Sequence, residues 1–287
     1  MRIAYLGDLV GTPGRQALTQ QIQVLRETHR ADLIIANSEN VANGSGITPE
    51  QYKKLRAAGV DGLTLGDHAF RKQQIRATLN DTDRMIRPLN LPPQAWGKGS
   101  MVIPGEGGRP DVYVAVLLGR LFMNTLQGSD PFVAIDRWLK TVPDDAVVLV
   151  ELHAEATSEK CALGWFLNGR VAAAVGSHTH VPTADARILP APGQDLSVYR
   201  HDGPTRPGTA YVTDLGMTGA RDSVLGRRVD RVVHHMSTGL PAAFDVAEGR
   251  PEVHGVILEI DDATRRATDI ERVCLSADVS NPPFTAG

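Results

Sequence analysis

The sequence predicts an α/β fold: a mostly parallel sheet with helices on both faces. Short, uninterrupted apolar runs recur along the 287-residue chain, as expected for strands that are buried on both faces. Amphipathic segments with helical spacing separate these runs, and such alternation is typical of βαβ units. The chain has 42% hydrophobic and 22% charged residues, ordinary values for a globular protein. It shows no linker and no internal repeat, so we expect a single domain over residues 1–275.

The first half of the chain shows the alternation most clearly. Apolar residues recur at helical spacing over residues 18–25, between the first and second predicted strands. The next helix is predicted to begin at Thr48, with Pro49 in its first turn and Gln51 closing a capping box. The predicted strands of this half are the apolar runs 3–6, 33–36 and 62–65.

The second half continues the pattern. Asp130 and Pro131 open a helix, and a second helix over 158–167 is predicted to stop at Asn168 and Gly169. Gly169 suits the left-handed conformation that often ends a helix. The predicted strands here are 112–118, 146–152, 171–175 and 209–212.

Two segments fall outside this alternation. Residues 190–208 are rich in Pro and Gly, and we expect a loop insertion there. Residues 276–287 are expected to form a loosely ordered tail. The predicted strands and helices therefore lie in the rest of the chain.

Composition excludes several classes of protein. The net charge of -3 gives no global basic field for binding duplex nucleic acid. The two cysteines, Cys161 and Cys274, form no disulfide framework, which favours a reducing compartment. The apolar run that ends before Asp8 is too short for a signal peptide, and no run approaches the ~20 residues that span a bilayer. We therefore expect a cytoplasmic protein without a membrane segment.

Side chains that can bind metal ions follow five of the predicted strands. Ligands of open α/β sheets bind beyond the carboxyl ends of the strands. One polar residue there is common, because turns favour Asp and Asn. Turn chemistry does not explain five strand ends of this kind, three of them with histidine. These residues are Asp8; Glu39 with Asn40; Asp67 with His68; His153; and His178 with His180.

Each residue taken alone also has an ordinary structural interpretation. Asp8 could cap a helix or close a turn, and Glu39 could be a solvated loop carboxylate. His153 could be a hydrogen-bonded core histidine. His178 and His180 are harder to explain in this way. On an extended segment, residues two apart point to the same side, so the two imidazoles are predicted to converge.

The set of ligands indicates the type of metal site. Carboxylate, amide and imidazole groups suit Fe, Mn or Zn better than Ca or Mg, and the absence of sulfur argues against a structural zinc site. Seven ligands are too many for one ion, so we expect two ions that share a carboxylate. Two metals about 3.5–4 Å apart can clamp a phosphoryl group and acidify a bridging water into the hydroxide nucleophile. His68 would then protonate the leaving oxygen.

The order of several motifs resembles one known family, the YmdB-type branch of the calcineurin-like metallophosphoesterases. The matching motifs run in the family's order over about nine-tenths of the chain, and the segment around His153 is highly specific. They include Gly7-Asp8-Leu9-Val10-Gly11, Asn37-Ser38-Glu39-Asn40, Gly66-Asp67-His68, the segment from His153 to Lys160, Gly176-Ser177-His178-Thr179-His180 and Thr213-Asp214.

The resemblance implies a layer arrangement, a substrate class and a set of ligands for each metal, which the residues alone do not give. It implies a four-layer α/β/β/α phosphoesterase, often with iron, that acts on phosphodiesters including 2′,3′-cyclic nucleotides and forms a homo-oligomer. The implied ligands are Asp8, Glu39, Asn40 and His180 for one metal, and Glu39, Asp67, His153 and His178 for the other. The family usually has Asn at the position of Asp67. The extra carboxylate is expected to tighten metal binding and to make the bound water less acidic.

Other functions fit the sequence less well. A dinucleotide fold is disfavoured by the wrong glycine spacing between Gly7 and Gly14 and would leave the histidines unexplained. A serine hydrolase is excluded because Ser177 lies in no nucleophile elbow. His234 and His235, taken as strand neighbours, would point to opposite faces and share no metal. A metal- or nucleotide-binding regulator with little or no turnover remains an open alternative, because of Asp67.

Overall fold

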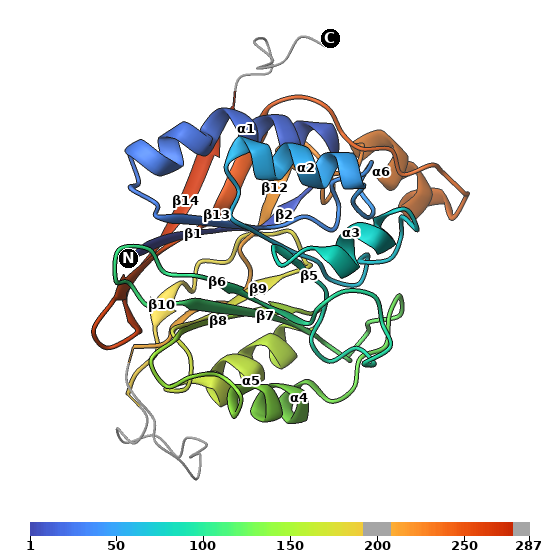
Figure 1. Ribbon diagram of the computed structural model, residues 1–287. Helices are drawn as coiled ribbons and strands as arrows, with labels where there is room; N and C mark the ends of the chain where they lie inside the picture. The colour runs from blue at the N-terminus through green and yellow to red at the C-terminus, as the bar shows by residue number, and fades with distance from the viewer. Residues whose placement is uncertain (192–207, 278–287) are drawn as a thin grey trace.

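Two β-sheets pack face to face in this computed structural model, which describes residues 1–191 and 208–277. Helices cover the outer face of each sheet, so the layers run α/β/β/α (Figure 1). The four-layer arrangement implied by the family resemblance is confirmed, whereas the single sheet predicted from the apolar runs is wrong. The runs could not distinguish the two, because a strand buried under a second sheet is as apolar as one buried under helices.

The first sheet holds the N-terminal strands. Its central strands are parallel, and β13 joins them in antiparallel orientation. The strand order is β2 (Asp8–Leu9), β12 (Met217–Ala220), β13 (Pro251–Asp261), β1 (Arg2–Leu6), β3 (Leu33–Asn37), β4 (Gly62–Thr64) and β5 (Met85–Ile86), with β14 (Arg266–Ser276) on β13. The helices packed on its outer face are α1 (Gly11–Glu27), α2 (Pro49–Ala58) and α3 (Ile75–Asp81).

The second sheet comes from the middle of the chain. Four neighbouring strands, β11, β9, β8 and β7, are parallel. The order is β10 (Arg187–Ile188), β11 (Ala210–Val212), β9 (Ala173–Ser177), β8 (Val147–His153), β7 (Val112–Leu118) and β6 (Ser100–Ile103). Its outer face is covered by α4 (Pro131–Leu139) and α5 (Thr157–Leu167) (Figure 1).

Alternate residues of each strand enter different parts of the core. Ile3 and Tyr5 of β1 pack between the two sheets, whereas Ala4 and Leu6 pack against the helices of the first layer. Burial of a large apolar side chain contributes about 1.5–3 kcal/mol, so both faces of such a strand must be apolar. This explains the uninterrupted apolar runs in the sequence.

Several predicted helix ends are confirmed. Thr48 and Gln51 form the reciprocal capping box of α2. The Asp130 side chain accepts hydrogen bonds from the first backbone N–H groups of α4. Gly169 follows α5 with φ +78°, in the left-handed region. These local signals were readable because they depend on neighbouring residues only.

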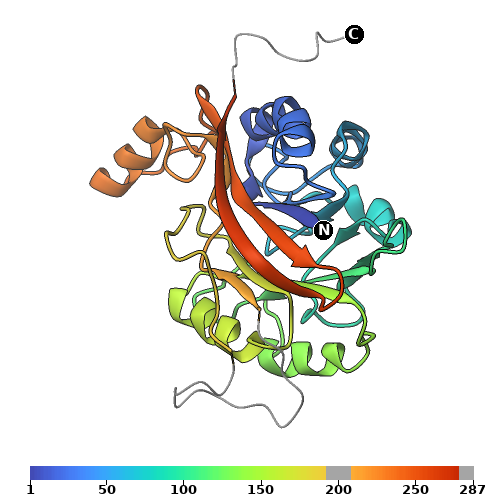
Figure 2. The same ribbon diagram turned by 90° about the vertical axis from the view of Figure 1, so that its left-hand side faces the viewer.

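A long hairpin near the C-terminus was not predicted. Strands β13 and β14 form one curved ribbon that runs along the side of the molecule (Figure 2). Ser276, predicted to begin the tail, is instead the last residue of β14. Residues 278–287 of that tail and 192–207 of the predicted insertion lie outside the described residues.

The helix α6 (Val229–Thr238) also differs from the expectation. It contains His234 and His235, which were treated as strand neighbours. His235 Nδ1 lies 2.8 Å from the carbonyl oxygen of Leu240, near the end of the helix. Across the described ranges, no helix is both long enough and apolar enough to cross a membrane.

Candidate metal centre

The ends of strands from both sheets meet at one rim of the molecule. There the structure joins all eight predicted site residues into one network of contacts. From the first sheet come Asp8 after β1, Glu39 and Asn40 after β3, and Asp67 and His68 after β4; from the second come His153 at the end of β8, and His178 and His180 after β9.

One half of the rim gathers four ligand atoms, from Glu39, Asp67, His153 and His178, all within 4.8 Å of one another. His153 Nε2 lies 3.3 Å from Glu39 Oε1 and 3.1 Å from Asp67 Oδ1. His178 Nδ1 lies 3.1 Å from the same nitrogen and 3.3 Å from the same Asp67 oxygen. One ring nitrogen cannot hydrogen-bond to all three neighbours. The convergence is what a shared cation requires.

The other half of the rim is formed around Asp8. Its carboxylate is fully buried, and within the described part of the chain Oδ1 has no hydrogen-bond partner. His180 Nε2 lies 3.6 Å from Oδ1 and 3.2 Å from the Asn40 amide nitrogen. A buried carboxylate oxygen without a donor is costly unless a cation satisfies it. This atom therefore fits a metal ligand.

Glu39 connects the two halves. Its Oε1 lies 3.3 Å from His153 Nε2 and 3.5 Å from the Asn40 amide nitrogen. Its Oε2 accepts a hydrogen bond of 2.9 Å from the backbone N–H of His68. The Asn40 Oδ1 is 2.8 Å from His68 Nδ1, so a rotation of the amide would be needed to turn that oxygen toward His180.

The hydrogen bonds of His153 select the tautomer that a metal needs. The Ser177 hydroxyl donates to Glu151 Oε1 at 2.6 Å, so its oxygen is left to accept from His153 Nδ1 at 2.8 Å. The Nε2 lone pair then faces Glu39 and Asp67. Hydrogen bonds to the ring nitrogen that does not bind the metal commonly orient metal-binding histidines.

Glu151 is a residue of the site that the sequence analysis missed. It is fully buried in β8 and binds Asn37 at 2.7 Å and Tyr5 at 2.9 Å, besides Ser177 and Thr64. The available signal was one acidic residue within the apolar run 146–152, since an unpaired carboxylate is too costly to bury there.

The turn after β9 is not extended, which contradicts the reason given for the convergence of its histidines. His178 has φ +86° and His180 φ +62°, both in the left-handed region that non-glycine residues rarely adopt. The two side chains contact different halves of the rim, His178 near Asp67 and His180 near Asp8.

A buried ion pair holds this turn in place, and it was also missed. Lys160 of α5 donates to Asp214 Oδ2 and to the Thr179 hydroxyl, each at 2.8 Å. Thr179 itself donates to the same carboxylate oxygen at 2.6 Å. Strained backbone persists where the surroundings fix it, and such positions cluster at functional sites.

The electrostatics favour ionised carboxylates. Burial alone would raise the pKa of Asp8, but the neighbouring His180 and His153 lower it overall. Burial alone would also raise the pKa of Asp67, but hydrogen bonds with His153 and His178 and the charges of neighbouring histidines together lower it. The pKa of His153 is raised well above its usual value by Glu39 and Asp67, although burial opposes this. The site thus attracts positive charge.

The chain is similar in sequence and fold to several known proteins. The Bacillus subtilis protein named 2′,3′-cyclic-nucleotide 2′-phosphodiesterase is 38% identical over 279 residues, which cover 97% of this chain and 98% of that protein. A crystal structure described as a hypothetical protein from Thermus thermophilus matches with a TM-score of 0.85 at 38% identity, covering 97% of this chain and all of the other. A structure described as a novel phosphatase from Mycoplasma pneumoniae also reaches a TM-score of 0.85, at 30% identity over 98% of this chain and 95% of that one.

These similarities extend over nearly the whole chain. The YmdB-like protein family matches residues 4–273. The chain belongs to the YmdB-like protein family.

Proposed function

We propose that this protein is a dinuclear metal-dependent phosphodiesterase that acts on 2′,3′-cyclic nucleotides or related phosphodiesters. The observation that carries the proposal is the convergence of Glu39, Asp67, His153 and His178 within 4.8 Å. Beside them lies Asp8 Oδ1, which has no hydrogen-bond partner among the described residues. The name of the Bacillus subtilis relative supports the substrate class.

The residues present fit two metal ions. Asp8, Glu39, Asn40 and His180 would hold one ion, and Glu39, Asp67, His153 and His178 the other. Oxygen and imidazole ligands suit Fe, Mn or Zn, and we propose iron. When bound, the metal pair would supply charge stabilisation for the phosphoryl group and an acidified water as nucleophile.

The chain's own residues would manage the protons. His68 is partly exposed, and its Nδ1 lies 2.8 Å from Asn40 Oδ1, so the ring is oriented by a hydrogen bond. Its Nε2 lies 3.7 Å from Asp67 Oδ2. A histidine held beside a carboxylate and open to solvent is suited to protonate the leaving oxygen. His153, locked as the Nδ1–H tautomer, would not take part in proton transfer.

The family resemblance implies Asn at the position of Asp67, so the carboxylate here is a departure from the implied pattern. Its Oδ1 contacts both His153 and His178, so the carboxylate lies within the ligand cluster. We propose that the added negative charge strengthens metal binding at this half of the rim.

Hydrolysis of bis(p-nitrophenyl) phosphate and of a 2′,3′-cyclic nucleotide in added Mn²⁺ tests the proposal. The wild type should hydrolyse both and should hold two metal equivalents per chain. Loss of a residue that only hydrogen-bonds to a metal ligand typically lowers activity about 10–100-fold. Glu39→Gln should lower activity more than this, because Glu39 would bind both metal ions.

Glu50→Gln is the matched control. Glu50 is an exposed residue of α2 whose carboxylate pairs with Lys54 and is not among the proposed metal ligands, so its loss should leave turnover unchanged. Wild-type protein that binds metal but hydrolyses neither substrate would instead indicate a regulator without turnover.

A further inference from the structure

A second group of metal-competent side chains lies on the β13–β14 hairpin. Glu252, His254 and Cys274 bring a carboxylate oxygen, a ring nitrogen and a thiol sulfur within 4.8 Å of one another. His254 of β13 is paired directly with Cys274 of β14, and Glu252 lies two residues earlier on the same face of the strand. None of these residues belongs to a motif recognisable in the sequence.

The three ligand atoms have the spacing of a tetrahedral zinc site. Zn–N and Zn–O bonds of about 2.05 Å and a Zn–S bond of about 2.3 Å give tetrahedral edges of about 3.3 Å for N–O and about 3.6 Å for edges to sulfur. Glu252 Oε2 lies 3.1 Å from His254 Nε2, and Cys274 Sγ lies 3.7 Å from each of them. We propose that Glu252, His254 and Cys274 bind one Zn²⁺ ion, separate from the candidate metal centre.

The charge of the group fits a divalent cation. A thiolate, a carboxylate and a neutral imidazole together balance the two charges of Zn²⁺. The mixture of sulfur, nitrogen and oxygen is typical of zinc ligands and differs from the sulfur-free rim. Without a cation, burial and the charge of Glu252 raise the pKa of the Cys274 thiol, and a bound cation would remove that repulsion.

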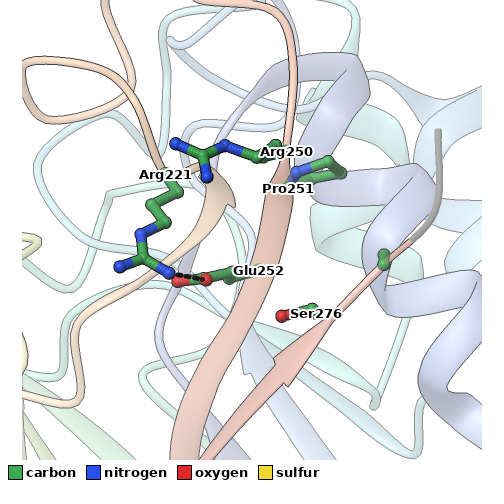
Figure 3. Close-up of a pocket in the computed structure, with 6 residues that line it drawn as sticks. Arg221, Arg250, Pro251, Glu252 and Ser276 are labelled. Atoms are coloured by element: carbon green, nitrogen blue, oxygen red, sulfur yellow. Dashed lines mark hydrogen bonds and ion pairs between the residues drawn. The ribbon is translucent and has the colours of Figure 1, made fainter.

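Arg221 positions the carboxylate for this role. Its Nη1 lies 3.0 Å from Glu252 Oε1 (Figure 3). The other carboxylate oxygen, Oε2, is left to face His254 and Cys274. Hydrogen bonds to the carboxylate oxygen that does not bind the metal commonly orient carboxylate ligands. Arg250 pairs with Asp222 rather than with Glu252.

The fourth coordination position would face a cavity. Glu252, His254 and Cys274 line it together with Met217 and His180, the latter also part of the candidate metal centre. Three protein ligands and an open position are the arrangement of zinc sites that keep a water or exchangeable ligand.

Cobalt substitution tests the proposal because a cobalt–thiolate bond has a charge-transfer absorption in the near ultraviolet. The chain has two cysteines, and no predicted ligand of the candidate metal centre is sulfur. Metal-free wild type titrated with Co²⁺ should develop this band until its intensity corresponds to one thiolate-bound Co²⁺ per chain, whatever further Co²⁺ the rim binds, and added Zn²⁺ should abolish it. Cys274→Ser should lack the band, and His254→Gln should weaken Co²⁺ binding at least 10-fold.

Cys161→Ser is the matched control and should keep the band. Cys161 lies on α5 and contacts Tyr211 and Thr213 rather than the hairpin cluster. Absence of the band in the wild type, its persistence in Cys274→Ser, or its loss in Cys161→Ser would overturn the proposal. Cys274 is exposed, so Cys274→Ser should fold and retain wild-type turnover of bis(p-nitrophenyl) phosphate. The cobalt band is measured independently of hydrolysis. The zinc site on the hairpin and the proposed phosphodiesterase function can therefore be disproved separately.

Discussion

At the residue scale, the chemistry of the rim depends on which atoms the hydrogen bonds leave free. The chain from Glu151 through Ser177 to His153 leaves only Nε2 of that imidazole for a cation. Asp8 Oδ1 is left without any donor within the described residues. Both are features of single atoms, and both distinguish a metal ligand from an ordinary buried polar side chain.

Ser177→Ala tests the role of the tautomer. The variant removes the acceptor of His153 Nδ1–H while leaving every proposed ligand in place. We expect metal affinity, or turnover at limiting metal, to fall about 10–100-fold. Titration of metal-free protein with Mn²⁺ measures this. An unchanged affinity would show that the Ser177 hydroxyl does not orient the ring. Ser38→Ala is the control, because the Ser38 hydroxyl donates to the Thr64 carbonyl at 3.3 Å and to no proposed metal ligand.

His68→Asn tests the proposed general acid. Loss of proton donation should lower kcat about 10²–10⁴-fold for a substrate with a poor leaving group such as a 2′,3′-cyclic nucleotide. Bis(p-nitrophenyl) phosphate needs little protonation, because nitrophenolate is a stable anion, and should be affected much less. Equal losses for both substrates, or a change in metal content, would assign His68 to the structure of the site instead.

At the element scale, close approach of backbone and side chain decides whether the rim can form. Gly66 lies between β4 and Asp67, and a Cβ atom built there would lie 2.1 Å from His153 Nε2. The end of a strand from the first sheet can therefore approach the imidazole from the second sheet only because residue 66 has no side chain.

Gly66→Ala should accordingly displace the His153 ring. The expected result is at least about 10-fold weaker metal binding, since the imidazole must leave the position that its outer hydrogen bond defines. Metal analysis after gel filtration measures the loss, and circular dichroism checks that the fold is retained. Full metal content in a folded variant would contradict the proposed ligand position.

At the scale of the whole molecule, a buried polar network joins the two sheets beneath the rim. Glu151 comes from β8 of the second sheet, and its partners Tyr5 and Asn37 come from β1 and β3 of the first. The network holds the two halves of the ligand set in register. Removing a hydrogen-bond partner of a buried charged group destabilises the fold, because the desolvation of the charged group is then no longer compensated.

Tyr5→Phe should therefore lower the free energy of unfolding by about 1.5–3 kcal/mol, the range for hydrogen bonds to charged groups. Urea denaturation measures the change. Tyr52→Phe, which removes a hydroxyl that contacts Thr82 in the outer helical layer, should cost less. Equal losses of unfolding free energy in the two variants would show that the hydrogen bond between the sheets stabilises the protein no more than the one in the outer helical layer.

The candidate site residues could be picked out from the sequence because each follows an apolar run that is recognisable on its own. Asp8, Glu39, Asp67, His153 and His178 all lie at ends of strands whose bounds the runs predicted to within a few residues. The capping signals of α2 and α4 were equally local. By itself, then, the sequence determined the strands, their polar ends and the family resemblance, since these depend on short stretches of chain.

Only the tertiary structure decided how those stretches meet. Apolar strands do not reveal whether helices or a second sheet cover them, so the layering, and with it the pairing of Glu151 with Tyr5, could not be read. The left-handed turn at His178 and His180 depends on the buried contact of Lys160 with Asp214, which lie 54 residues apart. The cluster on β13 and β14 likewise exists only through strand pairing, because the side chains of Glu252 and Cys274 converge in space and not in sequence.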